Sequence, residues 1–271
     1  MAEESVSVRR ACDTVGISRA AWYRPAPERL ERDSEVIEAL RRLTDKHRRW
    51  GFWKCYDRLR FEGKKWNHKK VYRVYCQLGL NYKRRTKKRV PSRVQRPLGT
   101  APTANSVWAL DFVHDALYIG RRFRTLTVID EGVREALVIE IDTSLTGERV
   151  VRTLEQVVAW RGKPSAIRCD NGPELLSQVF VDWCKRNDIE IRYIQPGKPN
   201  QNGYIERFNR TYREEVLSNY LFENLEQVRE ITYRWLVCYN EQRPHDALNG
   251  LPPSVFRKQQ TAKNSTLELS T

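Results

Sequence analysis

Hydrophobic and polar positions divide the chain into a first part with helical spacing and a second part with strand spacing. In the first part apolar residues recur three and four positions apart, which predicts helices. The expected helices are two short ones within 6–24, followed by 34–49, 53–62 and 68–78. Gly16 is expected in the turn between the two short helices, with Val15 and Ile17 on their apolar face. Ser18 and Asn67 are of the residue type that caps a following helix.

After residue 105 the pattern changes to short runs rich in β-branched residues, separated by polar breaks, which predicts strands. Strands are expected at 106–113, 122–130, 136–142, 165–169 and 189–194, and helices at 146–160, 174–187, after 203 and at 225–240. This order predicts an α/β fold with a mixed sheet flanked by helices. Asp130 and Asp142, at the ends of two strands, are expected to face solvent.

Composition and pattern together predict six segments. They are a helix-turn-helix-like segment at 1–27, a helical DNA-binding module at 34–82, a basic linker at 83–104, an α/β core at 105–220, a helical extension of that core at 221–257 and a disordered tail at 258–271. The first segment can equally be a structural helical hairpin. The second can be an amphipathic bundle whose charges are simply solvated.

Positive charge is concentrated in one stretch of the chain. The net charge is +15, and residues 51–100 contain 16 Lys and Arg against 2 Asp and Glu. A local excess of this size indicates a polyanionic partner, most simply nucleic acid, although a solvated basic linker is the alternative. The candidate DNA contacts are Lys64, Lys65, Lys69, Lys70, Arg73, Lys83, Arg84, Arg85, Lys87, Lys88 and Arg89.

Other classes of protein are disfavoured by what the pattern lacks. No apolar run approaches the roughly 20 residues that a membrane-spanning helix needs. The first residues have no apolar core of the signal-peptide kind. The six cysteines and four histidines show no zinc-type spacing. We therefore expect a cytoplasmic protein that has reduced cysteines and no membrane partner.

Three carboxylates are the candidate catalytic residues. Asp111 interrupts an apolar strand, Asp170 follows the fourth strand, and Glu206 lies on a later helix with 35 residues between it and Asp170. Carboxylate oxygens suit Mg²⁺, with Mn²⁺ as a substitute, and two such ions can activate a water or a 3′-hydroxyl for phosphodiester chemistry. Each carboxylate taken alone can also be an ordinary surface or turn residue.

Polar residues around Glu206 are candidates for DNA contact. Arg210 and Arg213 follow Glu206 at helical spacing and can bind the phosphates beside the cut bond. An intrahelical salt bridge from Glu206 to Arg210 is the alternative. Asn200, Gln201 and Asn202, in the loop before the helix, offer hydrogen-bond donors to DNA or to the carboxylates.

Four stretches of sequence resemble one known family. They are WALDFV, CDNGPE, QPGKPNQNGYIERFNRTYREEVL and YNEQRPHDALNGLPPSVF. They are similar to the catalytic core of insertion-sequence transposases with a retroviral-integrase-like fold, specifically the insertion-sequence-three family and its second-reading-frame type. The block WGFWKCYDRLRFEGKKWNHKKVYRVYCQLGL is similar to the helical module that precedes the core in such proteins, so the resemblance covers about 34–257.

The resemblance implies a ribonuclease-H-like core preceded by all-α modules of helix-turn-helix type. It implies that Asp111, Asp170 and Glu206 bind two Mg²⁺ ions, cut DNA at the terminal inverted repeats of the element and transfer the freed 3′-end to target DNA. The implied partners are double-stranded DNA and a second copy of the chain (at least a dimer), with or without the first-reading-frame product. The implied location is the bacterial cytoplasm, at the nucleoid. Arg243 and His245 would be structural or would contact DNA.

The sequence departs from the family pattern at Leu175, where an aromatic residue is expected, and at Trp53, where tyrosine is commoner. Two other functions are compatible with parts of the pattern. One is a DNA-binding regulator of transposition without catalysis, and the other is a ribonuclease-H-like nuclease without strand transfer. The complete set of carboxylates argues against the first, and the basic module favours transposition over the second.

Overall fold

The computed structural model describes residues 7–23, 29–81, 103–195 and 199–268, with the side chains of 29–31, 199–200 and 263–268 left out. Residues 83–102 of the predicted basic linker lie outside the described residues, among them Lys83, Arg84, Arg85, Lys87, Lys88 and Arg89. No described helix has both the length and the apolar character needed to cross a membrane.

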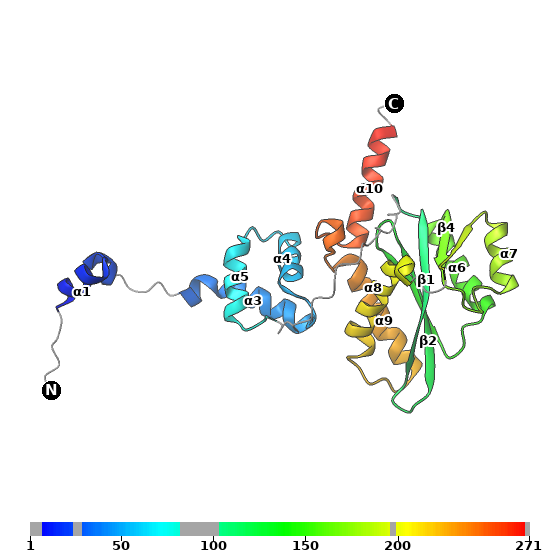
Figure 1. Ribbon diagram of the computed structural model, residues 1–271, viewed down its shortest axis with the longest axis horizontal. Coiled ribbons are helices and arrows are strands. Elements are labelled where there is room, and N and C mark those ends of the chain that lie inside the picture. Colours follow the sequence, from blue (N-terminus) through cyan, green and yellow to red (C-terminus); the bar gives the residue numbers. More distant parts are fainter. Residues whose placement is uncertain (1–6, 24–28, 82–102, 196–198, 269–271) are drawn as a thin grey trace.

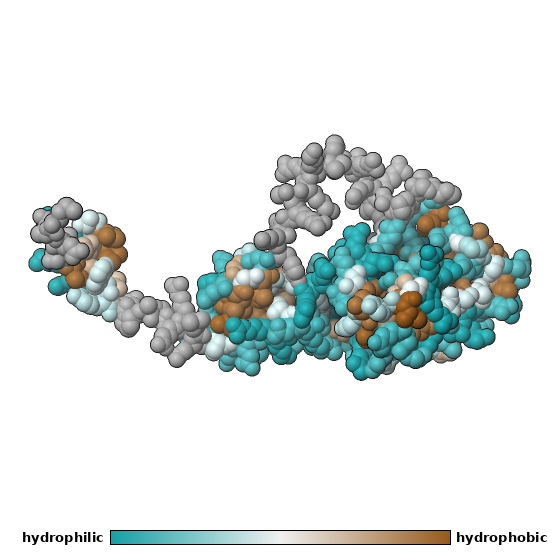
Figure 2. Space-filling model, turned by 90° about the horizontal axis from the view of Figure 1, so that it is seen from below, coloured by the Kyte–Doolittle hydropathy of each residue, from teal (hydrophilic) through white to brown (hydrophobic). Residues whose placement is uncertain are grey.

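The first two helices form where the pattern predicts them. They are α1 (Val8–Val15) and α2 (Arg19–Trp22), with Gly16 in the left-handed region at φ 71° between them and Ser18 capping α2. Of the apolar face expected there, Val8 and Ala11 are half-buried, whereas Val15 is 70% exposed and Ile17 38% exposed. Helices of eight and four residues are too short to bury an apolar face against each other. Figure 2 shows the resulting apolar surface at this pair.

The next three helices make a small bundle. They are α3 (Arg29–Lys46), α4 (Phe52–Phe61) and α5 (His68–Gln77). Their apolar positions meet in one cluster that includes Leu40, Trp50, Leu59 and Val74, all buried. Asn67 caps α5 as expected, because its side chain accepts a hydrogen bond from the amide of Lys69. The helical spacing in this part of the sequence therefore reflects a real core.

Five strands form one mixed sheet in the order β3-β2-β1-β4-β5 (Figure 1). The strands are β1 (Val107–Ala116), β2 (Arg122–Asp130), β3 (Ala136–Asp142), β4 (Ala166–Cys169) and β5 (Glu190–Tyr193). The first three pair antiparallel, and β4 and β5 run parallel to β1. This confirms the expected α/β class and the ribonuclease-H-like arrangement of the core.

Helices cover both faces of the sheet. On one face α6 (Gly147–Arg161) and α7 (Gln178–Arg186) pack against Trp108 and Leu110. On the other face α8 (Gly203–Tyr212) and α9 (Leu225–Glu241) pack against Ala109. Successive residues of a strand point to opposite faces, so one apolar run serves both layers. Short helical turns at Pro199–Asn202, Arg213–Leu217 and Asp246–Leu248 connect the elements.

Two aspartates that we expected in solvent are engaged by arginines. Asp130 is 0% exposed, and one of its oxygens lies 3.1 Å from Nη2 of Arg161, the last residue of α6. Asp142 is half-buried and lies 3.5 Å from Nη2 of Arg149. The expectation was wrong for Asp130, because helices that cover both faces of the sheet close this strand end to water. The Asp142 side chain keeps 28% of its surface exposed.

The tail also differs from the sequence-based expectation. Helix α10 (Pro253–Glu268) includes most of the segment expected to be disordered, and residues 269–271 lie outside the description. The helix is anchored at its start, where Nε of Arg257 lies 2.9 Å from a carboxylate oxygen of the buried Glu135. Helix formation propagates readily from an anchored first turn, even into a polar sequence.

Candidate active site

The pairing of β1 with β4 brings two of the three candidate carboxylates to one edge of the core. The strands are parallel, and Ala109 lies opposite Arg168. Continuing that register by two residues sets Asp111 level with Asp170, which directly follows the end of β4. The sheet therefore brings together two residues that are far apart in the sequence.

Asp111 is held by two hydrogen bonds. One carboxylate oxygen accepts from its neighbour, the amide of Phe112, at 2.8 Å. The other accepts from Nδ2 of Asn209 at 2.7 Å. The hydroxyl of Thr127, across the strand pair, lies 2.9 Å from Oδ1 of Asn209 and 3.0 Å from the carbonyl oxygen of Asp111. Thr127 and Asn209 therefore fix the position of the Asp111 carboxylate.

Glu206 reaches the same site on α8. It stands one helical turn before Asn209, so the two side chains lie on neighbouring positions of one helix face. Burial raises the pKa of Asp111 to about 6, and the negative charges of Asp170 and Glu206 add to that effect, while the bonds from Phe112 and Asn209 oppose it. The three carboxylates are thus close enough to repel one another.

The carboxylates do not form a finished metal cage. Among the described residues, no group of three or more His, Cys, Asp and Glu side chains stands close enough to hold a metal ion. The donor set nevertheless fits Mg²⁺ or Mn²⁺, because it consists of carboxylate oxygens and carries uncompensated negative charge. The charges of Asp170 and Glu206 add to the effect of burial on the pKa of Asp111, so a cation at this position would be favoured by all three carboxylates.

Two carboxylates, those of Asp170 and Glu174, hold the turn that follows β4. Oδ1 of Asp170 accepts a hydrogen bond from the amide of Gly172 at 3.0 Å. A Cβ placed on Gly172 would lie 3.1 Å from that oxygen and 3.3 Å from Oε2 of Glu174. Glu174 in turn pairs with Arg124, whose guanidinium lies 4.4 Å from the centre of the Phe112 ring. The turn is therefore tied to the strand that carries Asp111.

The residues that hold this site were not among the sequence-based candidates. Asn209 and Glu174 stand inside the motifs that contain Glu206 and Asp170, so their position in the motif was the available signal. Thr127 and Arg124 lie on a neighbouring strand with no motif of their own. Which residues of β1 they lie opposite could not be derived from the sequence, because it depends on how the two strands pair. Leu175, which replaces the expected aromatic residue, is fully buried in the core beside α7.

Two of the three loop residues form hydrogen bonds within the protein. Asn202 is buried and donates from Nδ2 to the carbonyl oxygen of Leu110 at 3.5 Å. The side-chain oxygen of Gln201 accepts from the amide of Gln195 at 2.8 Å. The structure therefore uses Gln201 and Asn202 to shape the loop before α8. The side chain of Asn200 lies outside the description.

The two arginines after Glu206 have different surroundings. Arg210 is exposed, and the part of the chain that the structure describes contains no ion pair between it and Glu206. Arg213 lies beyond the end of α8 and donates to the carbonyl oxygen of His114 at 3.1 Å. The salt-bridge alternative for Glu206 is therefore not formed, and Arg213 is held against β1 instead of sharing the Glu206 face.

Some basic residues of the helical module contact other side chains, and others are exposed without an ion pair in the described ranges. Nζ of Lys70 and Nη2 of Arg73 lie 3.5 Å and 2.8 Å from the carboxylate of Asp33. Nζ of Lys64 lies 5.0 Å from the centre of the Trp66 ring. Lys65 and Lys69 are exposed, with no side-chain ion pair in the described ranges. Lys65 and Lys69 are therefore the candidate residues of the module that are most available to a polyanion.

Arg243 and His245 are built into the protein. Arg243 is buried and pairs with Glu215, which also accepts a hydrogen bond from Nε1 of Trp235 at 2.8 Å. The rings of His245 and Tyr239 pack in a T-shaped arrangement, with their centroids 4.8 Å apart. Burial lowers the pKa of His245 to about 3. Both side chains fix the segment after α9 on the core.

Comparison with protein families matches most of the chain. Residues 101–199 and 187–253 each match a family described as integrase core domain, and residues 31–89 match one described as HTH-like domain. The second match region includes the α8 helix, and the first includes β1 to β5. The division into a helical module and a sheet core thus has counterparts in known families.

Two curated proteins resemble nearly the whole chain. The 31.7 kDa protein of insertion element IS407 from Burkholderia multivorans is 41% identical over 255 residues, which cover 93% of this chain and 91% of that protein. The 39.2 kDa protein of insertion element IS476 from Xanthomonas euvesicatoria is 40% identical over 251 residues, covering 93% and 72%. A solved structure of the HTLV-2 integrase catalytic core domain in complex with magnesium has a TM-score of 0.47 at 21% identity, covering 57% of this chain and 97% of that one.

Proposed function

Because the chain belongs to the insertion-sequence-three family of integrase-core transposases, in its second-reading-frame group, we propose that it cuts DNA at the ends of an insertion sequence and joins those ends to target DNA. Asp111, Asp170 and Glu206 are the proposed catalytic residues. The observation that carries the proposal is the set of contacts joining Asp111 to the Glu206 helix through Asn209, beside Asp170 on the neighbouring strand.

The proposed metal ligands are the same three carboxylates, and the proposed metal is Mg²⁺, two ions per site, with Mn²⁺ as a substitute. Bound divalent ions would supply the positive charge that activates a water or a 3′-hydroxyl and stabilises the leaving oxygen. The protein's own part is to hold the carboxylates. Asn209 orients Asp111, and the Gly172 amide orients Asp170. Arg210, exposed on α8, is a proposed phosphate contact.

The proposed partner is double-stranded DNA, both as terminal inverted repeats and as target. The HTH-like match at 31–89 and the exposed Lys65 and Lys69 support binding through the helical module. Phosphate contacts release counterions, so affinity should fall steeply as salt rises. Two element ends must be held together, so we propose at least a dimer, acting in the bacterial cytoplasm with or without the first-reading-frame product.

A nicking assay tests the proposal. Wild-type protein with Mg²⁺ should nick a labelled duplex that carries the element end, and Glu206→Gln should reduce nicking at least a hundredfold while DNA affinity stays within twofold. Glu155→Gln is the matched control, because Glu155 is an exposed glutamate on α6. Equal nicking by wild type and Glu206→Gln would contradict the assignment.

Strand transfer is measured separately by adding an unlabelled target duplex. Joined products would separate a transposase from a ribonuclease-H-like nuclease that only cuts. Binding without nicking, in wild type and with the first-frame product added, would instead favour a DNA-binding regulator.

A further inference from the structure

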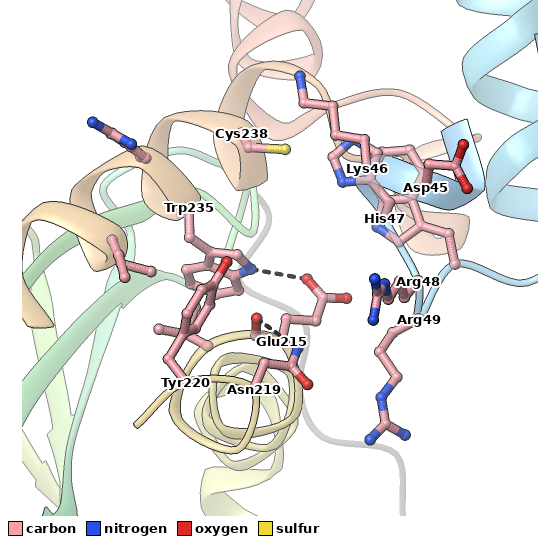
Figure 3. Close-up of a pocket in the computed structure, with 14 residues that line it drawn as sticks. Asp45, Lys46, His47, Arg48, Arg49, Glu215, Asn219, Tyr220, Trp235 and Cys238 are labelled. Carbon is pink, nitrogen blue, oxygen red and sulfur yellow. Dashed lines mark hydrogen bonds between the residues drawn. The ribbon is translucent and has the colours of Figure 1, made fainter. Parts of the chain in front are cut away.

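A cavity of about 650 Å³ lies where the helical module meets the core (Figure 3). One side is the turn from α3 to α4, residues 45–50. The other side consists of residues after α8 and on α9, among them Glu215, Tyr220 and Trp235. The two sides come from the regions that match the HTH-like domain and the integrase core domain. Any DNA that contacts both regions would therefore pass this junction.

The walls of the cavity are net positive. Lys46, Arg48 and Arg49 come from the first side, and the acidic residues are Asp45 and Glu215. The charge of Glu215 is already compensated by Arg243. Arg48 and Arg49 are both exposed, and within the described ranges neither forms an ion pair. Two open guanidinium groups beside a neutralised carboxylate are suited to an anion, and guanidinium binds phosphate with two parallel hydrogen bonds.

Flat aromatic side chains line the same space. The ring of His47 stacks on that of Trp50, with centroids 3.9 Å apart and planes 9° apart. Burial lowers the pKa of His47 to about 4, so the ring is neutral at pH 7. Tyr220 stands on the opposite side, 49% exposed. Figure 3 shows His47 and Tyr220 on facing sides of the cavity. Neutral rings of this kind are stacking partners for nucleobases.

The size of the cavity limits what can enter. The volume of about 650 Å³ lies within the usual range for ligand sites, about 300–1,000 Å³. Such a space can take one or two nucleotides, whereas a DNA duplex, whose major groove alone is ~12 Å wide, is too large to enter it.

We propose that this junction cavity binds an unpaired nucleotide of a DNA strand, with the phosphate at Arg48 and Arg49 and the base against Tyr220 and His47. The inference rests on the proposed function, because joining an element end to target DNA leaves unpaired strand ends beside the core. It adds a second DNA site, separate from the carboxylates and from Lys65 and Lys69. A free nucleotide shares the same chemistry, so the test must distinguish a strand from a monomer.

The test compares the affinity of the full chain for a blunt duplex and for the same duplex with a five-nucleotide thymidine extension. Binding is measured by fluorescence anisotropy in EDTA at one fixed salt concentration, so that no cutting occurs and electrostatics stay constant. Wild type should prefer the extended duplex about tenfold, as expected for a base stacked on an aromatic ring. Arg49→Ala and Tyr220→Ala should each reduce that preference to twofold or less, with blunt-duplex affinity within twofold of wild type.

The controls distinguish a loss of DNA binding from a loss of folding, and binding of a DNA strand from binding of a free nucleotide. Arg152→Ala removes an exposed arginine on α6 and should keep the full preference. A 2-aminopurine in the extension should lose fluorescence on binding to wild type and recover it with Tyr220→Ala, whose Tm should match wild type. Thymidine monophosphate at millimolar concentration should leave the preference intact.

Three outcomes would overturn the proposal. They are no preference for the extended duplex in wild type, an equal loss of both affinities in Arg49→Ala and Tyr220→Ala, and loss of the preference when the monophosphate is added. None of them depends on Mg²⁺ or on nicking. A failure of the carboxylate chemistry would appear in the nicking assay alone, so the two failures are distinguishable.

Discussion

Nδ2 of Asn209 donates a hydrogen bond of 2.7 Å to the carboxylate of Asp111, across 98 positions of sequence. This bond joins the central strand to the helix that carries Glu206. It also explains how a site made from three separate elements keeps its geometry, since Thr127 holds Asn209 from the other side. The contact is therefore the most direct target for testing how the site is positioned.

Asn209→Ala should lower the nicking rate about tenfold and raise the Mg²⁺ concentration needed for half-maximal nicking. The physical reason is that Asp111 loses the donor that orients it, and outer contacts of metal-binding carboxylates typically affect affinity or activity about 10- to 100-fold. The measurement is a Mg²⁺ titration of nicking together with DNA affinity, which should not change. An unchanged Mg²⁺ requirement would show that the bond does not position Asp111.

Arg161→Met should destabilise the core by about 3–5 kcal/mol, the usual cost of leaving a buried charge without its partner. Arg161 is nearly inaccessible and lies within about 3 Å of carboxylate oxygens of both Asp130 and Glu135. Urea unfolding measures the effect. Arg152→Met, an exposed position on the same helix, is the control and should change the unfolding free energy by no more than about 0.5 kcal/mol.

Gly132→Ala should destabilise the turn between β2 and β3. A Cβ at this position would lie 2.1 Å from the backbone oxygen of Thr103, a distance that backbone atoms can relieve only by moving. Overpacking of this kind costs about 1–3 kcal/mol or more. Gly51→Ala is the matched control, because its Cβ would meet nothing within 4 Å and its φ is negative. Thermal unfolding of both variants should lower Tm for Gly132→Ala only.

His245 should make the protein lose stability in mild acid. Its pKa is lowered to about 3 in the folded protein by burial and by nearby cations, with Arg243 first among them. Between the usual pKa of about 6.5 and that value, the unfolded chain binds a proton that the folded protein does not, so stability falls as pH falls. The loss due to this one group is about 2 kcal/mol at pH 5.

His245→Phe keeps a ring against Tyr239 and removes the titrating group. Unfolding free energies of the variant should therefore fall less than those of wild type between pH 7.5 and 5. His47, with a pKa lowered to about 4 and contacts with Lys46, contributes a similar loss that the variant retains. Parallel pH profiles for wild type and His245→Phe would refute the assignment.

Much of the fold followed from local patterns in the sequence. The positions of β2 and β3 match the apolar runs, and Gly16, Ser18 and Asn67 begin or end helices as their chemistry suggests. The resemblance of four motifs was enough to indicate the family and the ribonuclease-H-like class. The solvent exposure of Asp130 was predicted wrongly because Arg161 reaches it from a distant segment. A helix replaces the expected disordered tail, and its own Arg257 pairs with the distant Glu135.

Periodicity, caps and motifs are properties of neighbouring residues, so the amino-acid sequence predicted most of the elements and indicated the three candidate carboxylates. How these residues meet depends on the folded core. The strand register set Asp111 level with Asp170, and Asn209 tied the Glu206 helix to them. The junction of two domains created a basic, aromatic cavity that no stretch of sequence contains. The physical reason is that contacts between distant segments depend on packing of the whole core, which no local pattern records.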